Sequence, residues 1–472
     1  MVKRKLGLYF ATTLAVAVQT VFAQGLPGEI QARQAADAQL QSNIDAEAAA
    51  RAAAALQLQR NIDGEAGARA DADSRLQSQI DQLRSSIGGG GGSATVDCSS
   101  GGSVSQALAA GATQITVRGI CTESIEVNRD DVTLLGEPGA TIRGPDPTVN
   151  TINVRANRVT IDGLTVTGGR NGITGLGAAN LTVRNCTVQF TGRTGISYAS
   201  GSSGTVDGCV SQSNGRDGIA VDGAQANILN STATSNTRTG MLVSNGGTAR
   251  IGLTDRFTAA GNTIAHNGSS GVTVVYGSTA TIAMNTITDN GTSPNLPQLG
   301  INIISSFVSI AGGNNISNNA GQGVFAGTGS NVLLGDPSVG LTTVNTISGN
   351  GNSASSGGVF VFLGSTMVVR DAVIEQNNGP GLTYSMRSQG QTLSSTISNN
   401  RDVLTTSGGR NPGDGIRLTF GSALLPGTPT STISGNAGIA LQCTDQESSA
   451  VNTAALSFVG NLGGDFSTCS GF

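Results

Sequence analysis

Tryptophan is absent from the chain, histidine occurs once, as His266, and aromatic residues make up only 3% of its 472 residues. Charged residues are also scarce, at 12%, whereas glycine occurs 69 times without a period of three. This composition excludes the usual aromatic-rich core, and it excludes a collagen triple helix. We therefore expect small aliphatic core residues and many tight turns.

Lysine occurs only as Lys3 and Lys5, within an N-terminal segment that starts basic, continues apolar and ends at Ala23. This pattern predicts a signal peptide over residues 1–23, with an uncleaved anchor as the alternative. Cleavage leaves 23 arginines and 30 acidic residues, a net charge of 23 − 30 = −7. Such a balance argues against a nucleic-acid partner. No later stretch is long and apolar enough to be a transmembrane segment, so we expect a secreted extracellular or cell-surface protein, with the periplasm as the alternative.

Six cysteines in an exported chain favour disulfides. Intervals of 23, 23 and 26 residues suggest that neighbours in the sequence pair, namely Cys98 with Cys121, Cys186 with Cys209, and Cys443 with Cys469. Metal binding is the alternative, but the chain has no CxxC motif and a single histidine. We predict three disulfides, no metal site and no cofactor.

Residues 30–87 carry an 18-residue repeat, which is five turns of an α-helix. The repeat places leucines and isoleucines on one helix face: Leu40, Ile44, Leu58, Ile62, Leu76 and Ile80. A single helix cannot bury such a stripe, so we predict an α-helical coiled coil over residues 24–87 that self-associates, most simply as a homotrimer. A helix folded back on its own domain is the alternative. The segment GGGGGS at 88–93 predicts a linker.

After Ser93 the sequence changes to short alternating runs and recurrent glycines. Each recurrent glycine precedes an apolar residue, and most intervals are 22 or 23 residues: Gly172, Gly195, Gly218, Gly240, Gly271, Gly300, Gly323, Gly358, Gly381, Gly415 and Gly438. Asparagine-rich segments such as NTITDN recur with them. A period of this size that tolerates insertions predicts a solenoid of three short strands per coil, in which stacked asparagines hydrogen-bond to their copies.

These glycine steps and asparagine turns make residues 94–472 resemble a right-handed parallel β-helix of the pectin-lyase-like superfamily. The resemblance implies an all-β fold with a short helix near SVSQALAAG and a C-terminal cap in the last thirty residues. It also implies acidic-polysaccharide binding across one sheet, because the superfamily includes pectate lyases, polygalacturonases, alginate lyases and uronan epimerases.

The face of that sheet follows from strand alternation, since Ile219 and Val221 pointing inward send Ala220 outward. The equivalent outward positions are Thr174, Ser197, Ala220, Leu242, Thr273, Asn302, Phe325, Phe360, Thr383, Arg417 and Ala440. None carries a carboxylate, a histidine or a tyrosine. Hydrolysis needs two placed acids and β-elimination needs a base, so the row lacks a recognisable catalytic set.

Other polar residues are better explained by structure. Asp130, Asp131 and His266 fit surface turns, and Tyr198 and Tyr384 have the parity of core residues. Asp217 beside Arg216, with Asp222 nearby, is the remaining candidate for acid–base chemistry.

Four arginines recur two residues before a glycine step, as Arg170, Arg193, Arg216 and Arg238. Stacking puts them in adjacent coils about 4.8 Å apart, where neighbouring charges repel by roughly 0.9 kcal/mol in water. They either cover turns with their long side chains or, together with Asp217, bind an anionic glycan.

Farther along the same sheet the outward residues become apolar. Val275, Ile304, Phe325, Phe360 and Phe362 form a run that predicts a partner, a covering loop or a subunit contact.

The sequence thus favours a secreted, non-catalytic β-helix protein that is adhesin-like or binds an anionic polysaccharide. One alternative is a polysaccharide lyase, hydrolase or epimerase-like enzyme with an atypical site near Arg216 and Asp217. Another is a structural component of an extracellular assembly.

Overall fold

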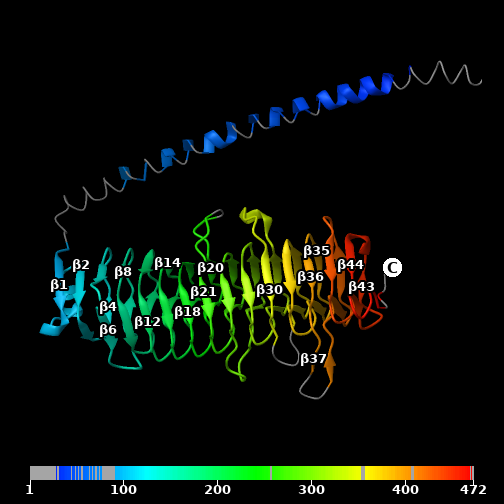
Figure 1. The fold of residues 1–472 in the computed structure, drawn as a ribbon. Coiled ribbons are helices and arrows are strands. Elements are labelled where there is room, and N and C mark those ends of the chain that lie inside the picture. The colour runs from blue at the N-terminus through cyan, green and yellow to red at the C-terminus, as the bar shows by residue number, and fades with distance from the viewer. Residues whose placement is uncertain are drawn as a thin grey trace, which may run out of the picture. The chain divides into compact units, whose positions relative to one another are not determined.

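A computed structural model describes residues 28, 31–43, 45–47, 49–51, 53–54, 57–62, 64–65, 67–69, 72–73, 75–76, 91–255, 258–351, 357–404, 409–467 and 469. The chain divides into two compact units, Met1–Gly90 and Gly91–Phe472. The second unit is a β-helix, in which the chain winds through three parallel sheets coil after coil (Figure 1). The predicted fold class is confirmed, with sheets of 15, 14 and 13 strands.

Each complete coil supplies one strand to each sheet, in the order 15-stranded, 14-stranded, 13-stranded. The 15-stranded sheet consists of β1 (Ser93–Asp97), β2 (Gln114–Arg118), β5 (Thr133–Gly136), β8 (Thr160–Asp162), β11 (Leu181–Arg184), β14 (Ser203–Asp207), β17 (Gln225–Leu229), β20 (Thr248–Ile251), β23 (Thr279–Ile282), β26 (Phe307–Ile310), β29 (Asn331–Leu334), β32 (Thr366–Arg370), β35 (Gln389–Leu393), β40 (Ala423–Pro426) and β43 (Ser449–Ala450). The 14-stranded sheet consists of β3 (Ile120–Thr122), β6 (Thr141–Gly144), β9 (Thr165–Gly168), β12 (Thr187–Gln189), β15 (Val210–Gln212), β18 (Thr232–Thr234), β21 (Thr263–Ala265), β24 (Thr286–Thr288), β27 (Asn315–Ser317), β30 (Asn345–Ser348), β33 (Ala372–Glu375), β36 (Thr396–Ser398), β41 (Ser431–Ser434) and β44 (Leu456–Val459).

The 13-stranded sheet is the one on which the predicted outward row lies. It consists of β4 (Ile125–Val127), β7 (Ile152–Val154), β10 (Ile173–Leu176), β13 (Ile196–Ala199), β16 (Ile219–Asp222), β19 (Met241–Ser244), β22 (Val272–Val275), β25 (Ile301–Ile304), β28 (Val324–Gly327), β31 (Val359–Phe362), β34 (Leu382–Ser385), β39 (Ile416–Thr419) and β42 (Leu441–Cys443). A two-stranded hairpin of β37 (Val403–Leu404) and β38 (Arg410–Asn411) lies outside the three sheets.

Alternation along each strand puts small aliphatic side chains inside, as the composition predicts. In β16, Ile219 and Val221 are fully buried. Tyr198 and Tyr384 are also fully buried, and each donates a hydrogen bond from its hydroxyl to a backbone carbonyl, which confirms their assignment to the core.

The recurrent glycine has a steric cause. A Cβ on Gly218 would lie 2.6 Å from the carbonyl oxygen of Gly240 in the next coil, and a Cβ on Gly240 would lie 2.7 Å from that of Gly271. No side chain fits so close to a backbone oxygen, which explains why glycine occupies this position in the ten successive coils from Gly172 to Gly415.

Asparagine ladders run through two corners of the β-helix, as predicted. In the corner between the 14- and 13-stranded sheets, each amide donates to the side-chain oxygen of the asparagine in the next coil, through Asn214, Asn236, Asn267, Asn290, Asn319, Asn350, Asn377, Asn400, Asn436 and Asn461. A shorter ladder through Asn262, Asn285, Asn314 and Asn345 lies between the 15- and 14-stranded sheets. These buried amides satisfy one another and backbone groups at the corners.

The N-terminal end is closed by the helix α2 (Val104–Ala109), where the resemblance placed one. Glu123 accepts hydrogen bonds from the backbone N–H groups of Val104 and Ser105, at 2.8 and 3.0 Å. A carboxylate at a helix N-terminus satisfies donors that have no partner within the helix. Next to it, η1 (Cys98–Ser100) is tied to β3 by the predicted disulfide between Cys98 and Cys121.

The C-terminal end leaves the regular pattern, as predicted. After β42 the chain forms β43, η3 (Thr453–Ala455) and β44, and then returns to pair Phe466 with Leu441. The predicted disulfide between Cys443 and Cys469 holds this last coil, and the rings of Phe458 and Phe466 pack edge to face at 4.7 Å. The end of the chain therefore covers the last regular coil.

The third predicted disulfide is wrong, because Cys186 and Cys209 are free and buried. They precede the paired residues Thr187 and Val210, so they occupy equivalent positions in adjacent coils. In-register side chains of parallel strands project side by side about 4.8 Å apart, farther than the Cβ separation of a disulfide. Each thiol instead donates to a backbone carbonyl, from Cys186 to Arg184 at 3.2 Å and from Cys209 to Val183 at 3.4 Å.

We expect the oxidised, unfolded protein to have two reactive cysteines and the folded protein none. Both thiols are buried, which keeps an alkylating reagent away from them in the folded protein, and the neighbouring Cys186 thiol together with burial raises the pKa of the Cys209 thiol. Alkylation with iodoacetamide without reductant, followed by mass spectrometry, checks this count. No labelling after unfolding would show that the third disulfide exists.

The first unit does not support the predicted long coiled coil over residues 24–87. Its described residues between 28 and 76 are helical and belong to a single chain, in which no second helix covers the apolar stripe. Leu40, Leu58 and Leu76 are more than half exposed. Ile44 and Ile80 lie outside the described residues, as do the predicted signal peptide and residues 88–90 of the predicted linker. Within the described part of the chain, no helix has the length and apolarity to cross a membrane.

Candidate functional site

A groove of about 620 Å³ lies on the outer face of the 13-stranded sheet. Its floor is made by outward residues of six successive strands, β10 to β25, namely Thr174, Ser197, Ala220, Leu242, Thr273 and Asn302. One rim carries the four predicted arginines, Arg170, Arg193, Arg216 and Arg238. Five spacings of about 4.8 Å make the floor roughly 24 Å long.

The strand register confirms ten of the eleven predicted outward positions, from Thr174 to Arg417. Ala440 is the exception, because it is fully buried and Gln442 pairs with Arg417. The row also extends backward through Asn153 to Glu126, two positions that no glycine step marks in the sequence. The row therefore contains one carboxylate, and Asn153 donates to both of its oxygens.

The arginine column forms as predicted. The backbone N–H of Arg193 donates to the carbonyl of Arg170 at 2.6 Å, and Arg216 and Arg238 continue the series at 2.8 and 2.7 Å. Burial and then the neighbouring guanidinium groups lower the pKa of Arg193 below its ordinary value. The four cations are thus close enough to repel one another, and an anion between them would relieve that repulsion.

Asp217 is the acidic residue within the column. Its carboxylate is 2% exposed and lies 3.1 Å from Nε of Arg216, and Thr239 donates a backbone N–H to it at 3.3 Å. Burial raises the pKa of Asp217 above its usual range, although Arg216 acts in the opposite direction. One buried carboxylate therefore offsets only one of four cationic side chains.

The difference in the free energy of unfolding between wild type and Asp217→Asn is expected to depend on pH. Because burial raises the pKa of this carboxyl in the folded state, the folded protein favours the protonated form. The stability of wild type relative to Asp217→Asn is expected to be greatest below the unfolded-state pKa and to fall as pH rises through the folded-state pKa. One pKa unit corresponds to about 1.4 kcal/mol. Urea unfolding between pH 3.5 and 7.5 measures the difference, and a rise with pH would contradict the assignment.

Several polar atoms at the groove are buried without a hydrogen-bond partner. Six such side-chain atoms occur among the described residues, and four belong to residues that line this groove. One of them, Arg216 Nε, has its ion pair with Asp217, so the unpartnered atoms at the groove are Asn150 Oδ1, Thr174 Oγ1 and Asn302 Oδ1. Thr174 and Asn302 are only 3% and 7% exposed. A buried polar atom without a partner is costly in a folded protein, so this clustering indicates a place where a ligand supplies the missing partners.

The opposite side of the groove carries Asp222, at the end of β16. It accepts hydrogen bonds from Ser244 at 3.0 Å and from Asn245 at 2.5 Å. Asp217 and Asp222 are five residues apart, and an extended segment of that length spans about 16 Å. Pairs of catalytic carboxylates in glycosidases are usually about 5 to 9.5 Å apart, whereas Asp217 precedes β16 and Asp222 ends it, so the two lie at opposite ends of this strand.

The remaining candidates have structural positions. Asp130 and Asp131 both pair with Arg158, at 3.2 and 2.8 Å. His266 has a positive φ of 57°, matching the value of 54° at Asp289 in the next coil, as expected for a turn position. Among the described residues, Cys98, Cys121 and Glu123 are the one group close enough to hold a metal ion, and the disulfide uses both sulfurs.

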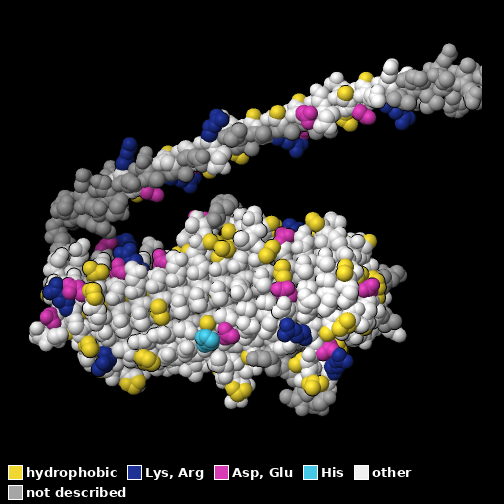
Figure 2. All heavy atoms as spheres, in the orientation of Figure 1, with side chains coloured by type: hydrophobic (Ala, Val, Ile, Leu, Met, Phe, Trp, Pro, Cys, Tyr) yellow, Lys and Arg dark blue, Asp and Glu magenta, His cyan; other side chains and the backbone are white. Residues whose placement is uncertain are grey.

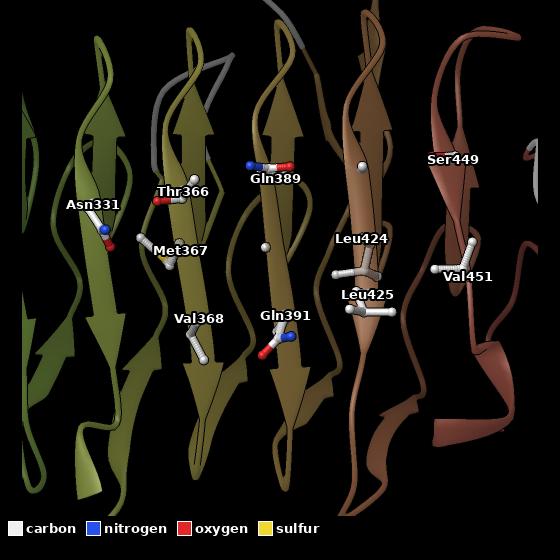
Figure 3. A pocket seen from close by; sticks show the side chains of 12 residues that line it. Asn331, Thr366, Met367, Val368, Gln389, Gln391, Leu424, Leu425, Ser449 and Val451 are labelled. Carbon is white, nitrogen blue, oxygen red and sulfur yellow. The ribbon is translucent and has the colours of Figure 1, made fainter. Parts of the chain in front are cut away.

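Other surfaces of the β-helix differ from the groove. Figure 2 shows a face of the β-helix on which charged side chains are sparse. A second hollow of about 330 Å³ lies on the 15-stranded sheet, lined by uncharged residues that include Gln389, Gln391 and Leu425 (Figure 3). The four arginines therefore distinguish the groove on the 13-stranded sheet from the hollow on the 15-stranded sheet.

A family model described as the right-handed β-helix region matches residues 103–255. No curated protein matches the sequence. Similar solved structures include the mannuronan C-5 epimerase AlgE4 A-module of Azotobacter vinelandii, with 14% identity, a TM-score of 0.34, and coverage of 84% of this chain and 93% of that one.

Pectate lyase Pel9A is similar at 15% identity and a TM-score of 0.37, over 60% of this chain and 78% of its own. The Dettilon tailspike protein is similar at 11% identity and a TM-score of 0.28, over 75% and 64%. At these TM-scores the likenesses carry no conclusion about the activity of this chain. The family match and the three parallel sheets make residues 91–472 a right-handed parallel β-helix.

Proposed function

We propose that the protein is an exported, adhesin-like module that binds an acidic polysaccharide in the groove of the 13-stranded sheet. The observation that carries this proposal is the combination of a stacked arginine rim with unpartnered buried polar atoms at the same groove. The two disulfides are compatible with a location outside the cytoplasm.

Charge favours an anionic ligand. The groove has four arginines against the carboxylates of Asp217 and Asp222, whereas the chain as a whole carries a net charge of −4. A cationic groove on an acidic protein concentrates the attraction for anions in one place. Arginine also pairs with carboxylate or sulfate groups through two parallel hydrogen bonds.

The floor favours a carbohydrate over other polyanions. Asn302 Oδ1 accepts hydrogen bonds only, so its missing partner has to be a donor. A sugar hydroxyl is such a donor, and the Thr174 hydroxyl can either donate to a sugar or accept from it. A polyphosphate offers acceptors for arginine but no donor for Asn302.

The direct test is binding of residues 24–472 to immobilised polygalacturonate, alginate and heparin, with neutral dextran as control. We expect retention on at least one acidic polymer, none on dextran, and release as salt rises, since exposed charge pairs are screened. Equal retention on acidic and neutral polymers, or none on any, would refute the proposal.

An enzyme acting on the same polymers is the second candidate, because a buried carboxyl with a raised pKa is a feature of proton-transferring residues. Its acid–base pair would be Arg216 and Asp217 in an atypical lyase, hydrolase or epimerase-like site. Prolonged incubation with each polymer, followed by assays for unsaturated products, new reducing ends and altered uronate composition, distinguishes the two candidates. A structural role in an extracellular assembly predicts neither binding nor turnover.

Self-association through residues 30–87 remains a prediction. The leucines of this repeat that the structure describes are exposed in the single chain, so a second copy could cover them. Light scattering is expected to give a multiple of the monomer mass for residues 24–472, with a trimer simplest, and the monomer mass for residues 91–472. Equal numbers of chains per particle would show that the repeat plays no part in association.

A further inference from the structure

Three phenylalanines form a contiguous cluster on the same outer face, beyond the groove. Phe325 lies on β28, and Phe360 and Phe362 lie on the adjacent strand β31. Their ring centroids are 5.6 to 6.3 Å apart, and the rings are tilted at 33 to 48° to one another. All three side chains are partly exposed. Aromatic area at a protein surface is costly unless something packs on it.

The cluster continues the floor of the groove. Phe325 is the register partner of Asn302, the last floor residue, and Ile304, which lines the groove, pairs with Gly327. A Cβ on Gly327 would lie 2.7 Å from the Phe325 ring, so glycine allows that ring to lie across its own strand. The surface therefore passes from an unpartnered acceptor at Asn302 directly to an aromatic ring.

We propose that Phe325, Phe360 and Phe362 form a platform for the uncharged face of a sugar ring in the acidic polysaccharide. This inference rests on the proposed function. The C–H groups on one face of a pyranose are weakly positive and match the negative face of an aromatic ring, while the hydroxyls at the ring edge remain hydrated. The platform selects glycans with an accessible C–H face next to their charged groups.

The spacing makes the platform a separate subsite. Three strand spacings separate β19, which follows Arg238, from β28, which carries Phe325, or about 14 Å. A disaccharide held at the arginines does not reach the platform, whereas a hexasaccharide does. The platform therefore contributes to the affinity of long oligomers only.

The test compares digalacturonate with hexagalacturonate by isothermal titration calorimetry on wild type, Phe360→Ala and Phe360→Leu. Phe360→Leu keeps an apolar side chain without a ring, so it remains informative if the alanine variant folds poorly. Phe307→Ala is the matched control, because Phe307 is 43% exposed on the 15-stranded sheet. We expect both Phe360 variants to lose about 5- to 20-fold in hexasaccharide affinity with unchanged disaccharide affinity, and the control to bind as wild type.

The two possible failures are distinct. If wild type binds the hexasaccharide and both Phe360 variants bind it equally well, the platform is overturned and the proposed function stands. Equal losses for the disaccharide and the hexasaccharide would also overturn it, because the effect would then not depend on reach. If wild type binds neither oligomer, the acidic-glycan function fails for this polymer and the platform fails with it.

Discussion

Asn290→Ala is expected to lower the free energy of unfolding by about 3 to 5 kcal/mol, because each buried group left without a partner costs about 1 to 3 kcal/mol. The Asn290 amide donates to the carbonyl of Ile264 and to Asn319 Oδ1, both at 3.0 Å. Its oxygen accepts from the backbone and side-chain nitrogens of Asn267, at 3.2 and 2.9 Å. Alanine removes all of these bonds at once and breaks the ladder in the middle of the β-helix.

The matched control for this substitution is Asn315→Ala. Asn315 lies on the neighbouring coil, in β27, but its side chain is exposed and does not belong to the corner ladders. Its replacement should change stability by less than about 0.5 kcal/mol. Urea unfolding followed by far-UV circular dichroism measures both variants, and similar midpoints for the two would show that the ladder contributes little.

Replacing Arg193 and Arg216 together by alanine is expected to weaken binding to the preferred acidic polysaccharide by 100-fold or more. Hydrogen bonds to charged groups contribute about 1.5 to 3 kcal/mol each, so two lost guanidinium contacts correspond to about two or more powers of ten. The salt dependence of the remaining binding should also become shallower, since fewer charges take part. Affinity measured at 50 and 200 mM salt tests both expectations.

The control is the double variant Arg143→Ala with Arg250→Ala, which removes the same total charge from exposed positions on the other two sheets. If attraction came from overall charge, the two double variants would lose affinity equally. A specific arginine rim predicts that the control binds within about two-fold of wild type. Equal losses would remove the rim from the binding model.

The fold could be predicted from the sequence because the same steric requirement for glycine recurs in successive coils. Gly218 and its counterparts face a backbone oxygen in the next coil, so no other residue fits, and the period appears directly in the letters. Near the ends this signal weakens. Glu126 and Asn153 follow no glycine step, so the predicted outward row started too late in the chain. At the other end, Ala440 stands beside Gly415 where the preceding coils have glycine, so the last outward position was assigned to Ala440 instead of Gln442.

The candidate site could be predicted only in part from the sequence. Spacing alone predicted the arginine column, because equivalent positions in a solenoid must stack. The unpartnered atoms of Thr174 and Asn302 could not be predicted, since they depend on which neighbours fail to reach them. The predicted disulfide between Cys186 and Cys209 was wrong for a related reason. Sequence spacing predicts that two residues are close, but not the directions in which their side chains project.

The corner ladders also bear on how this protein can change. Some coils exceed the common interval of 23 residues. The coil between Gly271 and Gly300 carries its extra residues in the turn after Asn290, and the ladder still continues from Asn290 to Asn319 in the next coil. A mutation that lengthens a turn can thus alter a wall beside the proposed binding face while every strand keeps its neighbour. If the groove binds a ligand as proposed, changes in the turns can alter which ligand it takes while the ladders that stabilise the fold stay unchanged.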